Sequence, residues 1–596
     1  MNMTTMEKIE ALRSAMRRHK VDGVYIPSSD PHRTEYLPAH WRARAWFSGF
    51  TGSAGTLCVT QEQAALWTDG RYFIQAARQL EGSGIQLMRM RQPGVPTVED
   101  WLAGHLPQGG ALALDGLCIS GAQAEKLQKA CGPAGIRLAD LDLVTEVWKQ
   151  DRPPVPATEM WMLPEETAGS STSQKLAQLR ERLAKLGCSG ALLSRLDCVA
   201  WLTNLRADDV EYTPFAIAYC LVEKEKATLF TDTGRIPAKT AEQCARQGLN
   251  LRPYTQVEQA LRSLPEGTVL LCDPQETSWK MEQILSEQKG VRIVRETDPV
   301  IRMKAVRCQA EMAASHQAHR LDGAAMVRFE RELRRRMESG EGWTEGAAAR
   351  YLLALRRQAP ECLGESFETI AAWGPNAAMM HYAPDENGGA ALQAKGFFLV
   401  DSGGQYTCGT TDITRTYALG LLTQEERRAY TLVLKAHIAM SRAVFPQGRS
   451  GSEIDALARV ELWRYGLDYR CGTGHGVGFV GVIHEGPQGL SQDNRAVFEP
   501  GTMVTVEPGV YQEGEYGVRI ENEVLCTAAG QTEYGNFLQF EAETFCPIDT
   551  RPLCMEMLTE DERNWLNRYH QQVCRELKDL LAQEEYAWLC DVCKPV

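Results

Sequence analysis

The sequence predicts a multidomain chain with two α/β units, then an α+β unit, then a short helical extension. Three observations predict this architecture. The chain has 596 residues, more than one hydrophobic core usually serves, so we expect about three or four domains. Its first half contains an internal repeat. Its second half begins with long helical patterns and then changes to short strand-like runs broken by glycine and proline.

Two pairs of similar segments make up the repeat. The helical segment KIEALR, beginning at Lys8, leads into the apolar run GVYI, and KLAQLR, beginning at Lys175, leads into GALL. Further along, LWTDGR beginning at Leu66 matches LFTDTGR beginning at Leu229 at a similar offset. Two copies of one α/β unit explain this better than one large domain. The proline-rich residues 151–173 are expected to form the linker between them.

The second half shows an α+β pattern. A long helix is predicted over residues 299–338 and another over residues 344–355. From residue 365 onward, runs such as FFLV, VTV and residues 518–524 predict strands of an antiparallel sheet that helices cover.

The chain is expected to end in an amphipathic helix. The segment TEDE, beginning at Thr559, has the spacing of a capping box. Apolar residues follow it at helical spacing, and we expect this stripe to pack against the same chain or a second copy. The stripe consists of Trp565, Tyr569, Val573, Leu577 and Leu580.

Composition and charge argue against several classes of function. The net charge of −13 argues against nucleic acid as a main partner, because phosphate binding needs a basic surface. There is no signal-peptide core at the start and no run of about 18 apolar residues, so we expect neither secretion nor a membrane span. The 18 irregularly spaced cysteines are expected to be free thiols in a reducing, cytoplasmic compartment. Cys590 and Cys593 form one CxxC with no second pair, which argues against structural zinc.

Four acidic residues fall inside strand-like runs of the second half. Asp401 follows four apolar residues, Asp412 sits among β-branched residues, Glu507 ends VTVE, and Glu521 lies in VRIEN. A carboxylate buried in a strand is destabilising unless it is paired or bound to a metal, and few basic residues lie in these segments. Two divalent cations would balance four ionised carboxylates that share one site.

A histidine in a glycine-rich turn completes this set. His475 lies in GTGHGVG, where glycines allow close backbone approach and unusual φ. A phosphate loop is the alternative, but the following FVGVI, residues 479–483, predicts a strand rather than a helix. Four oxygen ligands and one nitrogen favour Mn²⁺, with Co²⁺ or Mg²⁺ as alternatives, over a zinc site rich in nitrogen or sulfur.

The order Asp, Asp, His, Glu, Glu is highly specific. Together with the segments VDSGG, TTDITRT, GTGHGVG, HEGP, TVEPGVY and VRIENEV, it resembles the pita-bread metallopeptidases. Within that group the chain resembles the long, three-domain Xaa-Pro aminopeptidase (aminopeptidase P) family. The resemblance extends almost end to end and includes FTGSAG, LWTDGRYF and the TDP…MK entry to the catalytic domain.

The resemblance implies a domain organisation. It implies two creatinase-like α/β domains at residues 1–155 and 156–303. A pita-bread metallopeptidase domain is expected at residues 304–537, followed by a helical extension at residues 538–596.

The resemblance also implies a role for each ligand. Asp412 and Glu521 are expected to bridge two divalent metals. Asp401 is expected to complete one coordination sphere, and His475 with Glu507 the other.

Further residues match the substrate-handling positions of the family. His381 and His484 match its substrate histidines, although both could be satisfied core histidines instead. Glu507 is the expected general base and Arg519 is expected to support the ligands from behind, while Arg71 is expected to reach the substrate.

One position departs from the family pattern. Where the family often has HGTGH, this chain has CGTGH, with Cys471 in place of the first histidine. The metal set is unaffected, but one substrate or proton contact changes. Cys471 is expected near the active site, either as a reactive thiolate or as an inert buried filler.

The expected function is therefore release of the N-terminal residue from peptides that have proline in second position. The substrates would need a free N-terminus, and a homodimer is expected from the resemblance. A prolidase-like dipeptidase would keep the same ligands. Methionine aminopeptidase lacks the two N-terminal units, and creatinase-type hydrolysis uses this fold without metal. A non-catalytic binding module is disfavoured because all five ligands are present.

Overall fold

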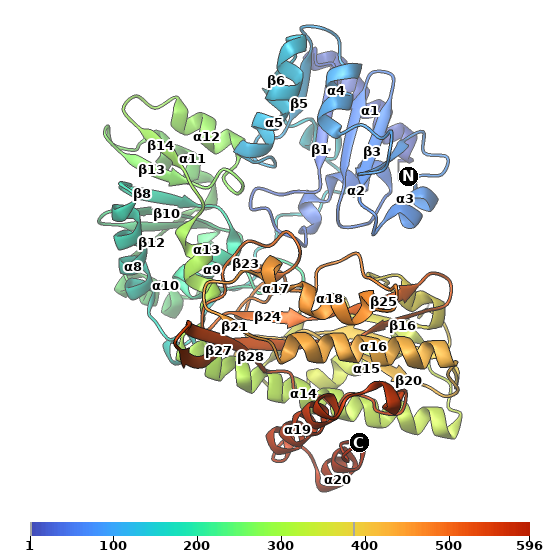
Figure 1. The fold of residues 1–596 in the computed structure, drawn as a ribbon. Helices are drawn as coiled ribbons and strands as arrows, with labels where there is room; N and C mark the ends of the chain where they lie inside the picture. The colour runs from blue at the N-terminus through green and yellow to red at the C-terminus, as the bar shows by residue number, and fades with distance from the viewer. Residues whose placement is uncertain (1–2, 385–387) are drawn as a thin grey trace. The chain divides into compact units, whose positions relative to one another are not determined.

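The structure is a computed structural model that describes residues 3–384 and 388–596. The chain forms two compact units (Figure 1). Unit 1 comprises Met1–Leu163, Ser170–Glu211 and Phe215–Val300, and unit 2 comprises Pro164–Gly169, Tyr212–Pro214 and Ile301–Val596.

Unit 1 contains two six-stranded sheets with the same topology. In each sheet one central strand pairs antiparallel with its neighbour on one side and parallel with its neighbour on the other. This shared order confirms the internal repeat predicted from the sequence. The first sheet runs β4 (Gln86–Arg89), β3 (Ala64–Thr68), β2 (Thr56–Thr60), β1 (Gly23–Pro27), β5 (Ala111–Leu114), β6 (Arg137–Asp140). The second runs β12 (Leu249–Pro253), β11 (Ala227–Thr231), β10 (Tyr219–Glu223), β8 (Gly190–Leu193), β13 (Val269–Cys272), β14 (Arg292–Arg295).

A capped amphipathic helix leads into the central strand of each sheet. Helix α1 (Thr5–His19) begins with a capping box between Thr4 and Glu7. Helix α8 (Thr172–Lys185) begins with an equivalent box between Ser171 and Gln174. The linker predicted at residues 151–173 holds only two short elements besides the start of α8. These are β7 (Trp161–Met162), which pairs with β9 (Leu205–Arg206), and α7 (Glu165–Ala168).

Long helices open unit 2, but the first one is interrupted. The continuous helix predicted over residues 299–338 is wrong, because α13 (Pro299–Ala305) and α14 (Gln309–Ser339) are separate. Between them Val306 pairs with Thr502, and extended Cys308 starts the second helix. The predicted helix at residues 344–355 is confirmed as α15 (Glu345–Arg356).

Antiparallel sheets follow in unit 2, as the sequence predicts. Two sheets and a hairpin bear on the site: a six-stranded sheet, a three-stranded sheet and the pair β25–β26. The six strands are β21 (Val444–Pro446), β28 (Gly535–Ala542), β27 (Asn522–Thr532), β24 (Met503–Val506), β22 (Gly474–Gly476) and β23 (Glu485–Leu490). The three strands are β16 (Ile370–Trp373), β17 (Phe397–Ser402) and β20 (Ile413–Ala418). The hairpin is β25 (Gly509–Gln512) and β26 (Tyr516–Arg519).

Two strand predictions are wrong in detail. Residues 518–524 do not form one strand, because β26 ends at Arg519 and β27 begins at Asn522. Between them Glu521 turns to β20, where its N–H donates to Thr414 O at 3.1 Å. Residues 479–483 form no strand, and Val480 has a φ of 46° that no strand accommodates.

The C-terminal helices pack on the core of unit 2. The capping box at Thr559 is confirmed, and it opens α19 (Glu560–Leu577), which precedes α20 (Gln583–Val592) (Figure 1). Tyr569, Val573 and Leu577 are buried in the same apolar cluster as α16 (Gln424–Ser441), which confirms that the stripe packs against its own chain. Among the described residues, no helix has the length and apolar character needed to cross a bilayer.

One histidine joins α14 to the C-terminal part of the unit. His316 Nδ1 lies 2.9 Å from Glu543 Oε2, and its Nε2 lies 3.3 Å from Glu576 Oε2 on α19. The hydrogen bond to Glu543 is the main cause that raises the pKa of His316, although partial burial opposes it.

We therefore expect this contact to stabilise the fold at low pH and to weaken as pH rises. A raised folded-state pKa gives a contribution that is complete below about 6.5, the unfolded value, and is lost as pH rises through the folded value. Urea unfolding of His316→Gln should differ from the unsubstituted protein at about pH 6 and converge with it near pH 9. His105→Gln is the control, because that imidazole contacts a backbone carbonyl. A difference for His316→Gln that grows with pH would contradict the assignment.

Candidate metal centre

Strand ends of unit 2 place three of the predicted ligands close together. Asp412 lies just before β20, His475 lies in β22, and Glu521 lies between β26 and β27. One ligand atom from each side chain lies within 4.8 Å of the other two. Among the described residues, this trio is the group of potential metal ligands that lie so close together. His475 Nε2 is 3.4 Å from Asp412 Oδ2.

The other two predicted ligands flank this trio. Glu507 follows β24, and its Oε1 lies 3.6 Å from His475 Nε2. Asp401 lies in β17, and its Oδ2 accepts a hydrogen bond from Arg519 Nη2 at 2.5 Å. The four carboxylates act on one another electrostatically, so all five predicted ligands border one region.

Close backbone approach explains the glycine beside His475. A Cβ on Gly474 would lie 1.8 Å from the carbonyl oxygen of Thr505 on the neighbouring strand. That approach lets the His475 N–H donate to Thr505 Oγ1 at 3.0 Å and the Glu507 N–H donate to Thr473 O at 2.7 Å. The expectation of unusual φ is wrong here, because the described glycines of GTGHGVG have no positive φ.

Hydroxyl groups that sequence reasoning missed orient the carboxylates. Thr414 Oγ1 donates to Glu521 Oε2 at 2.6 Å, and Thr505 Oγ1 donates to Glu507 Oε1 at 3.3 Å. Arg519 Nε in turn donates to Thr414 Oγ1 at 3.1 Å. The sequence offered these threonines only as strand-forming residues; their position one or two residues from a strand carboxylate is the signal that could have identified them.

Arg519 is held rigidly behind the ligands. Its guanidinium is buried and donates to Asp401, to Thr414 and, at 2.7 Å, to Tyr511 Oη. This arrangement agrees with the supporting role that the resemblance implies. The guanidinium neutralises Asp401, whereas Asp412 and Glu507 lie near the imidazole of His475.

Burial and repulsion from neighbouring carboxylates raise the pKa values of two of the carboxyl groups, Asp412 and Glu521. Burial raises the pKa of Asp412 to about 7; pairing with His475 opposes the rise and the charge of Asp401 adds to it. Burial, and then the charge of Asp412, raise the pKa of Glu521 well above its usual value. Burial lowers the pKa of His475, but pairing with Asp412 and the charge of Glu507 outweigh that effect and raise it to about 10.

These features fit divalent cations. The Asp401 Oδ1 atom is buried and, within the described part of the chain, accepts no hydrogen bond. The donor set offers several carboxylate oxygens and one imidazole nitrogen, and a buried carboxylate without a compensating cation is strongly disfavoured. The residues present are therefore suited to hold two divalent metals.

The predicted substrate residues lie in different places. The His484 ring contacts the His475 ring at a centroid distance of 4.3 Å, so His484 borders the ligands. His381 is exposed and follows the short helix η5 (Gly374–Ala378), which packs against β26. Arg71 lies in unit 1, where its guanidinium is paired with Asp69 at 2.8 Å. The structure thus brings His484 to the ligands; the roles of the other two stay predictions.

Cys471 lies where the sequence places it, beside the site. Its thiol is partly buried against the apolar core of unit 2. Burial, and then the charge of Glu507, raise the pKa of Cys471 to about 12. This favours the protonated thiol and therefore the inert filler of the two interpretations.

A buried polar network fixes the turn that carries Cys471 and His475. Asp455 accepts from Thr473 Oγ1 at 2.5 Å and from Arg459 Nε at 2.6 Å. Arg459 also donates to the carbonyl oxygens of Tyr469 and Cys471, at 2.8 and 2.7 Å. The carbonyl oxygen of Thr473 also accepts a hydrogen bond from the backbone N–H of Glu507, the residue after β24. This network therefore positions both the turn that carries His475 and the strand end that carries Glu507.

A buried ion pair anchors the segment after His484. Lys304 Nζ lies 2.6 Å from Glu485 Oε2, and both side chains are buried. Breaking such a pair would leave one charge buried without its partner, so it holds the HEGP segment in place. The TDP…MK and HEGP segments of the sequence therefore meet in the fold.

Known proteins resemble this chain over most of its length. A "Probable Xaa-Pro aminopeptidase P" from Neurospora crassa is 37% identical over 592 residues, covering 96% of this chain and 86% of that protein. The model of metallopeptidase family M24 matches residues 313–528. The chain belongs to metallopeptidase family M24. Its membership confirms the resemblance and the prediction of a metal-dependent peptidase.

Other parts of the M24 chain match as well. Models of the creatinase/prolidase N-terminal domain match residues 8–147 and 151–311, and the model of the C-terminal region of peptidase M24 matches residues 536–596. "Aminopeptidase P2" of Arabidopsis thaliana is 35% identical over 99% of this chain and 88% of that protein. The predicted fold class, two creatinase-like domains before a pita-bread domain, is confirmed.

A solved structure matches the whole chain. The X-prolyl aminopeptidase from Caenorhabditis elegans, described as a cytosolic enzyme with a di-nuclear active site, is 34% identical. The match covers 100% of both chains with a TM-score of 0.93. Prolidase from Pyrococcus furiosus, 23% identical over 61% of this chain with a TM-score of 0.50, shares the fold.

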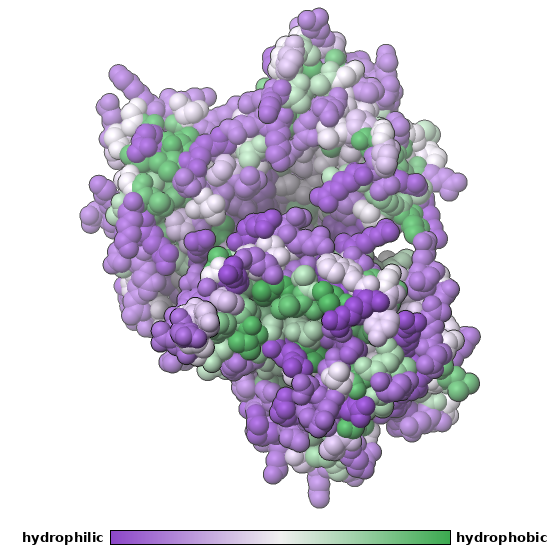
Figure 2. All heavy atoms as spheres, viewed as in Figure 1, coloured by the Kyte–Doolittle hydropathy of each residue, from purple (hydrophilic) through white to green (hydrophobic). Residues whose placement is uncertain are grey.

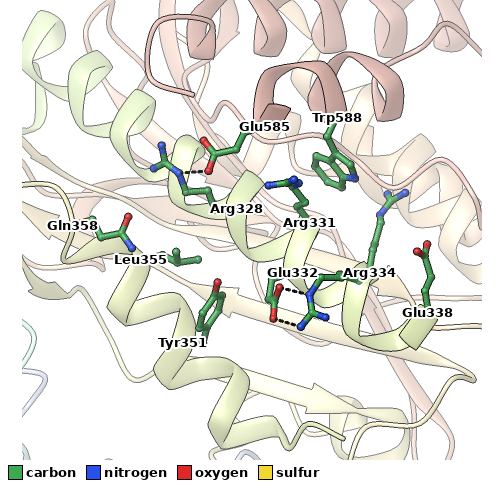
Figure 3. Close-up of a pocket in the computed structure, with 11 residues that line it drawn as sticks. Arg328, Arg331, Glu332, Arg334, Glu338, Tyr351, Leu355, Gln358, Glu585 and Trp588 are labelled. Atoms are coloured by element: carbon green, nitrogen blue, oxygen red, sulfur yellow. Dashed lines mark hydrogen bonds and ion pairs between the residues drawn. The ribbon is translucent and has the colours of Figure 1, made fainter. Parts of the chain in front are cut away.

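A hollow of about 530 Å³ lies elsewhere in unit 2, between α14, α15 and α20 (Figure 3). Its charged side chains are largely paired with each other, as Arg328 Nε is with Glu585 Oε1 at 3.0 Å. None of the predicted ligands or substrate residues lines it. The hollow is therefore separate from the metal centre of this M24 enzyme.

We predict that Asp412→Ala binds less metal and loses peptidase activity. Its carboxylate lies within reach of both His475 and Glu521, so its removal should disrupt the shared part of the site. Activity should fall by more than ~100-fold even with excess Mn²⁺, since loss of an outer partner alone costs up to about that much. Elemental analysis after gel filtration measures bound metal. Glu513→Ala, an exposed carboxylate in the β25–β26 turn, is the matched control. Full metal content in Asp412→Ala would contradict the assignment.

Proposed function

We propose that this protein is a dinuclear metal aminopeptidase that releases the N-terminal residue from peptides with proline in second position. The observation that carries the proposal is the convergence of the five predicted ligands on one buried region of an M24 fold. The end-to-end similarity to an X-prolyl aminopeptidase supports the substrate class.

The five ligands divide between two sites in this proposal. Asp412 and Glu521, which lie close together with His475, would hold both ions between them. Asp401 would complete the ligands of one ion, and His475 with Glu507 those of the other. When bound, the two ions supply an acidified water and polarise the scissile carbonyl.

The side chains around the ligands move the protons. Glu507 accepts the proton of the attacking water and later delivers it to the departing nitrogen. Thr505 Oγ1 orients this carboxylate through the 3.3 Å hydrogen bond. His484, whose ring contacts His475, stabilises the oxyanion that develops on the carbonyl, and His381 is the second candidate for that contact.

Selectivity for proline must come from shape rather than from a hydrogen bond. A peptide nitrogen contributed by proline is a tertiary amide and has no N–H for the enzyme to bind. We propose that His381, His484 and Cys471 border the substrate and that Arg71 reaches it. A thiol at Cys471 leaves that position without the donor that an imidazole would offer.

Mn²⁺ is the proposed metal, with Co²⁺ as the alternative. Oxygen-rich ligand sets with one imidazole suit Mn²⁺ better than they suit softer metals. A cytoplasmic location is proposed because the solved relative is described as cytosolic and because all described cysteines are free thiols.

We also propose a homodimer. Figure 2 shows apolar side chains gathered on the face of unit 2 that carries α16 and α18 (Ala456–Trp463). Leu457, Trp463 and Tyr465 in this region are each 44–45% exposed. Contiguous exposed apolar surface is typical of protein interfaces.

The same comparisons support a proposed domain division. We propose creatinase-like domains at residues 1–155 and 156–303, the catalytic domain at 304–537 and the helical extension at 538–596. The four family matches support boundaries near these positions.

The experiment that tests the proposal offers short peptides to the enzyme with Mn²⁺. We expect free alanine and Pro-Ala from Ala-Pro-Ala, and no release from the N-acetylated peptide because the free amine is recognised near the metals. A chelator should abolish the reaction and Mn²⁺ should restore it. The Asp412→Ala protein controls for contaminating peptidases.

Three outcomes would redirect or refute the proposal. Cleavage of the dipeptide Ala-Pro without any action on Ala-Pro-Ala would favour a prolidase-like dipeptidase. Efficient release of methionine from Met-Ala-Ser with no action on Xaa-Pro peptides would refute proline selectivity. Full activity in chelator, with metal content verified as zero, would refute the two-metal mechanism.

A further inference from the structure

Ion pairs and apolar packing dock the last two helices on unit 2. Arg328 of α14 donates to Glu585 Oε1 of α20 at 3.0 Å and to the carbonyl of Leu580, in the connection between the helices, at 2.8 Å (Figure 3). The Arg334 guanidinium lies 5.5 Å from the centre of the Trp588 ring. These contacts hold α20 against α14, and none of them involves a cysteine side chain.

Three cysteines meet on this helix pair. Cys590 lies in the last turn of α20 and Cys593 caps that helix, so the CxxC spacing places both on one face. Cys574, in the last turn of α19, forms side-chain hydrogen bonds with both. The sequence shows only the CxxC; the fold adds the third thiol.

The three thiols differ in exposure. Cys593 is 8% exposed and belongs to the apolar core of unit 2, Cys574 is half-buried, and Cys590 is exposed. A hydrogen bond from Cys593, and then one from Cys590, lower the pKa of Cys574 to about 7 although burial opposes them. A lowered pKa favours the thiolate of Cys574, and the thiolate is the form that attacks disulfides.

A metal site is the competing interpretation, and the geometry disfavours it. In the described part of the chain, the group whose ligand atoms all lie within 4.8 Å of one another is Asp412, His475 and Glu521, not the three thiols. Cys574 instead contacts each of the other two thiols separately. A central thiol with two alternative partners suits exchange better than closed metal coordination.

We propose that Cys574, Cys590 and Cys593 form a thiol–disulfide exchange site that takes a small-molecule disulfide of the glutathione class, with Cys574 as its attacking thiol. The thiolate of Cys574 attacks one sulfur of the small disulfide, forming a mixed disulfide and releasing one small thiolate. Cys590 or Cys593 gives its proton to water and attacks the Cys574 sulfur, and the second small thiolate leaves. Two protein thiols are oxidised to one disulfide between α19 and α20, and the small disulfide is reduced to two thiols.

The site is independent of the peptidase chemistry, but it lies on a helix that touches the supports of the metal ligands. Tyr569 of α19 accepts a hydrogen bond from Arg415 Nη2 at 2.9 Å. Arg415 Nη1 in turn donates to the carbonyl of Glu521 at 2.6 Å. A disulfide between α19 and α20 would therefore restrain the helix that contacts Arg415 and, through it, the backbone of Glu521.

The test treats the full-length, metal-loaded enzyme with oxidised glutathione near pH 7, followed by alkylation under denaturing conditions and peptide mass mapping. We expect loss of two alkylatable thiols per chain and a peptide in which Cys574 is joined to Cys590 or Cys593. Native alkylation of Cys574 should show a pH midpoint near 7, whereas Cys308 should require a higher pH because burial raises its pKa. Cys308→Ser is the matched control, since that exposed cysteine lies outside the cluster.

Two variants separate the steps. With Cys590 and Cys593 both changed to serine, Cys574 should stop at the mixed disulfide with glutathione. Cys574→Ser should form no bridge between the helices. The proposal is overturned if Cys574 stays reduced under conditions that modify Cys308, or if the only disulfide formed joins Cys590 to Cys593.

Discussion

The repulsion among four clustered carboxylates is the constraint on which the catalytic unit depends. Asp401, Asp412, Glu507 and Glu521 come from separate strand ends, and the charges of neighbouring carboxylates help to raise the pKa values of Asp412 and Glu521. A fold built only from protein atoms would have to protonate some of them or turn them to solvent. The structure instead keeps them facing one another, which is stable only with added positive charge.

The surrounding structure holds these carboxylates in place rather than neutralising them. Arg519 pairs with one carboxylate, and threonine hydroxyls from β20 and β24 orient two others. Behind these, the Asp455–Arg459 network fixes the glycine-rich turn, and Arg415 ties the backbone of Glu521 to α19. Each layer uses charge-assisted hydrogen bonds, which suits a site that must keep its geometry when cations enter and leave.

Much of this arrangement could be predicted from the sequence, because carboxylates inside apolar runs and a glycine-flanked histidine are local patterns. The repeat of unit 1 was equally accessible, since helix and strand recur in the same order. Features that depend on distant partners were not. The break at Glu521 follows from its contacts with Thr414, and the end of the first helix follows from pairing of Val306 with Thr502. The meeting of Cys574 with the CxxC requires the two helices to pack.

The most direct test of the central claim is a crystal of the Mn²⁺-loaded enzyme measured at the manganese absorption edge. The account predicts two anomalous peaks about 3.5–4 Å apart. Oxygens of Asp412 and Glu521 should lie between them, with Asp401 beside one peak and His475 beside the other. A single peak, or two peaks that do not share a carboxylate, would contradict the claim that paired cations balance these four buried charges.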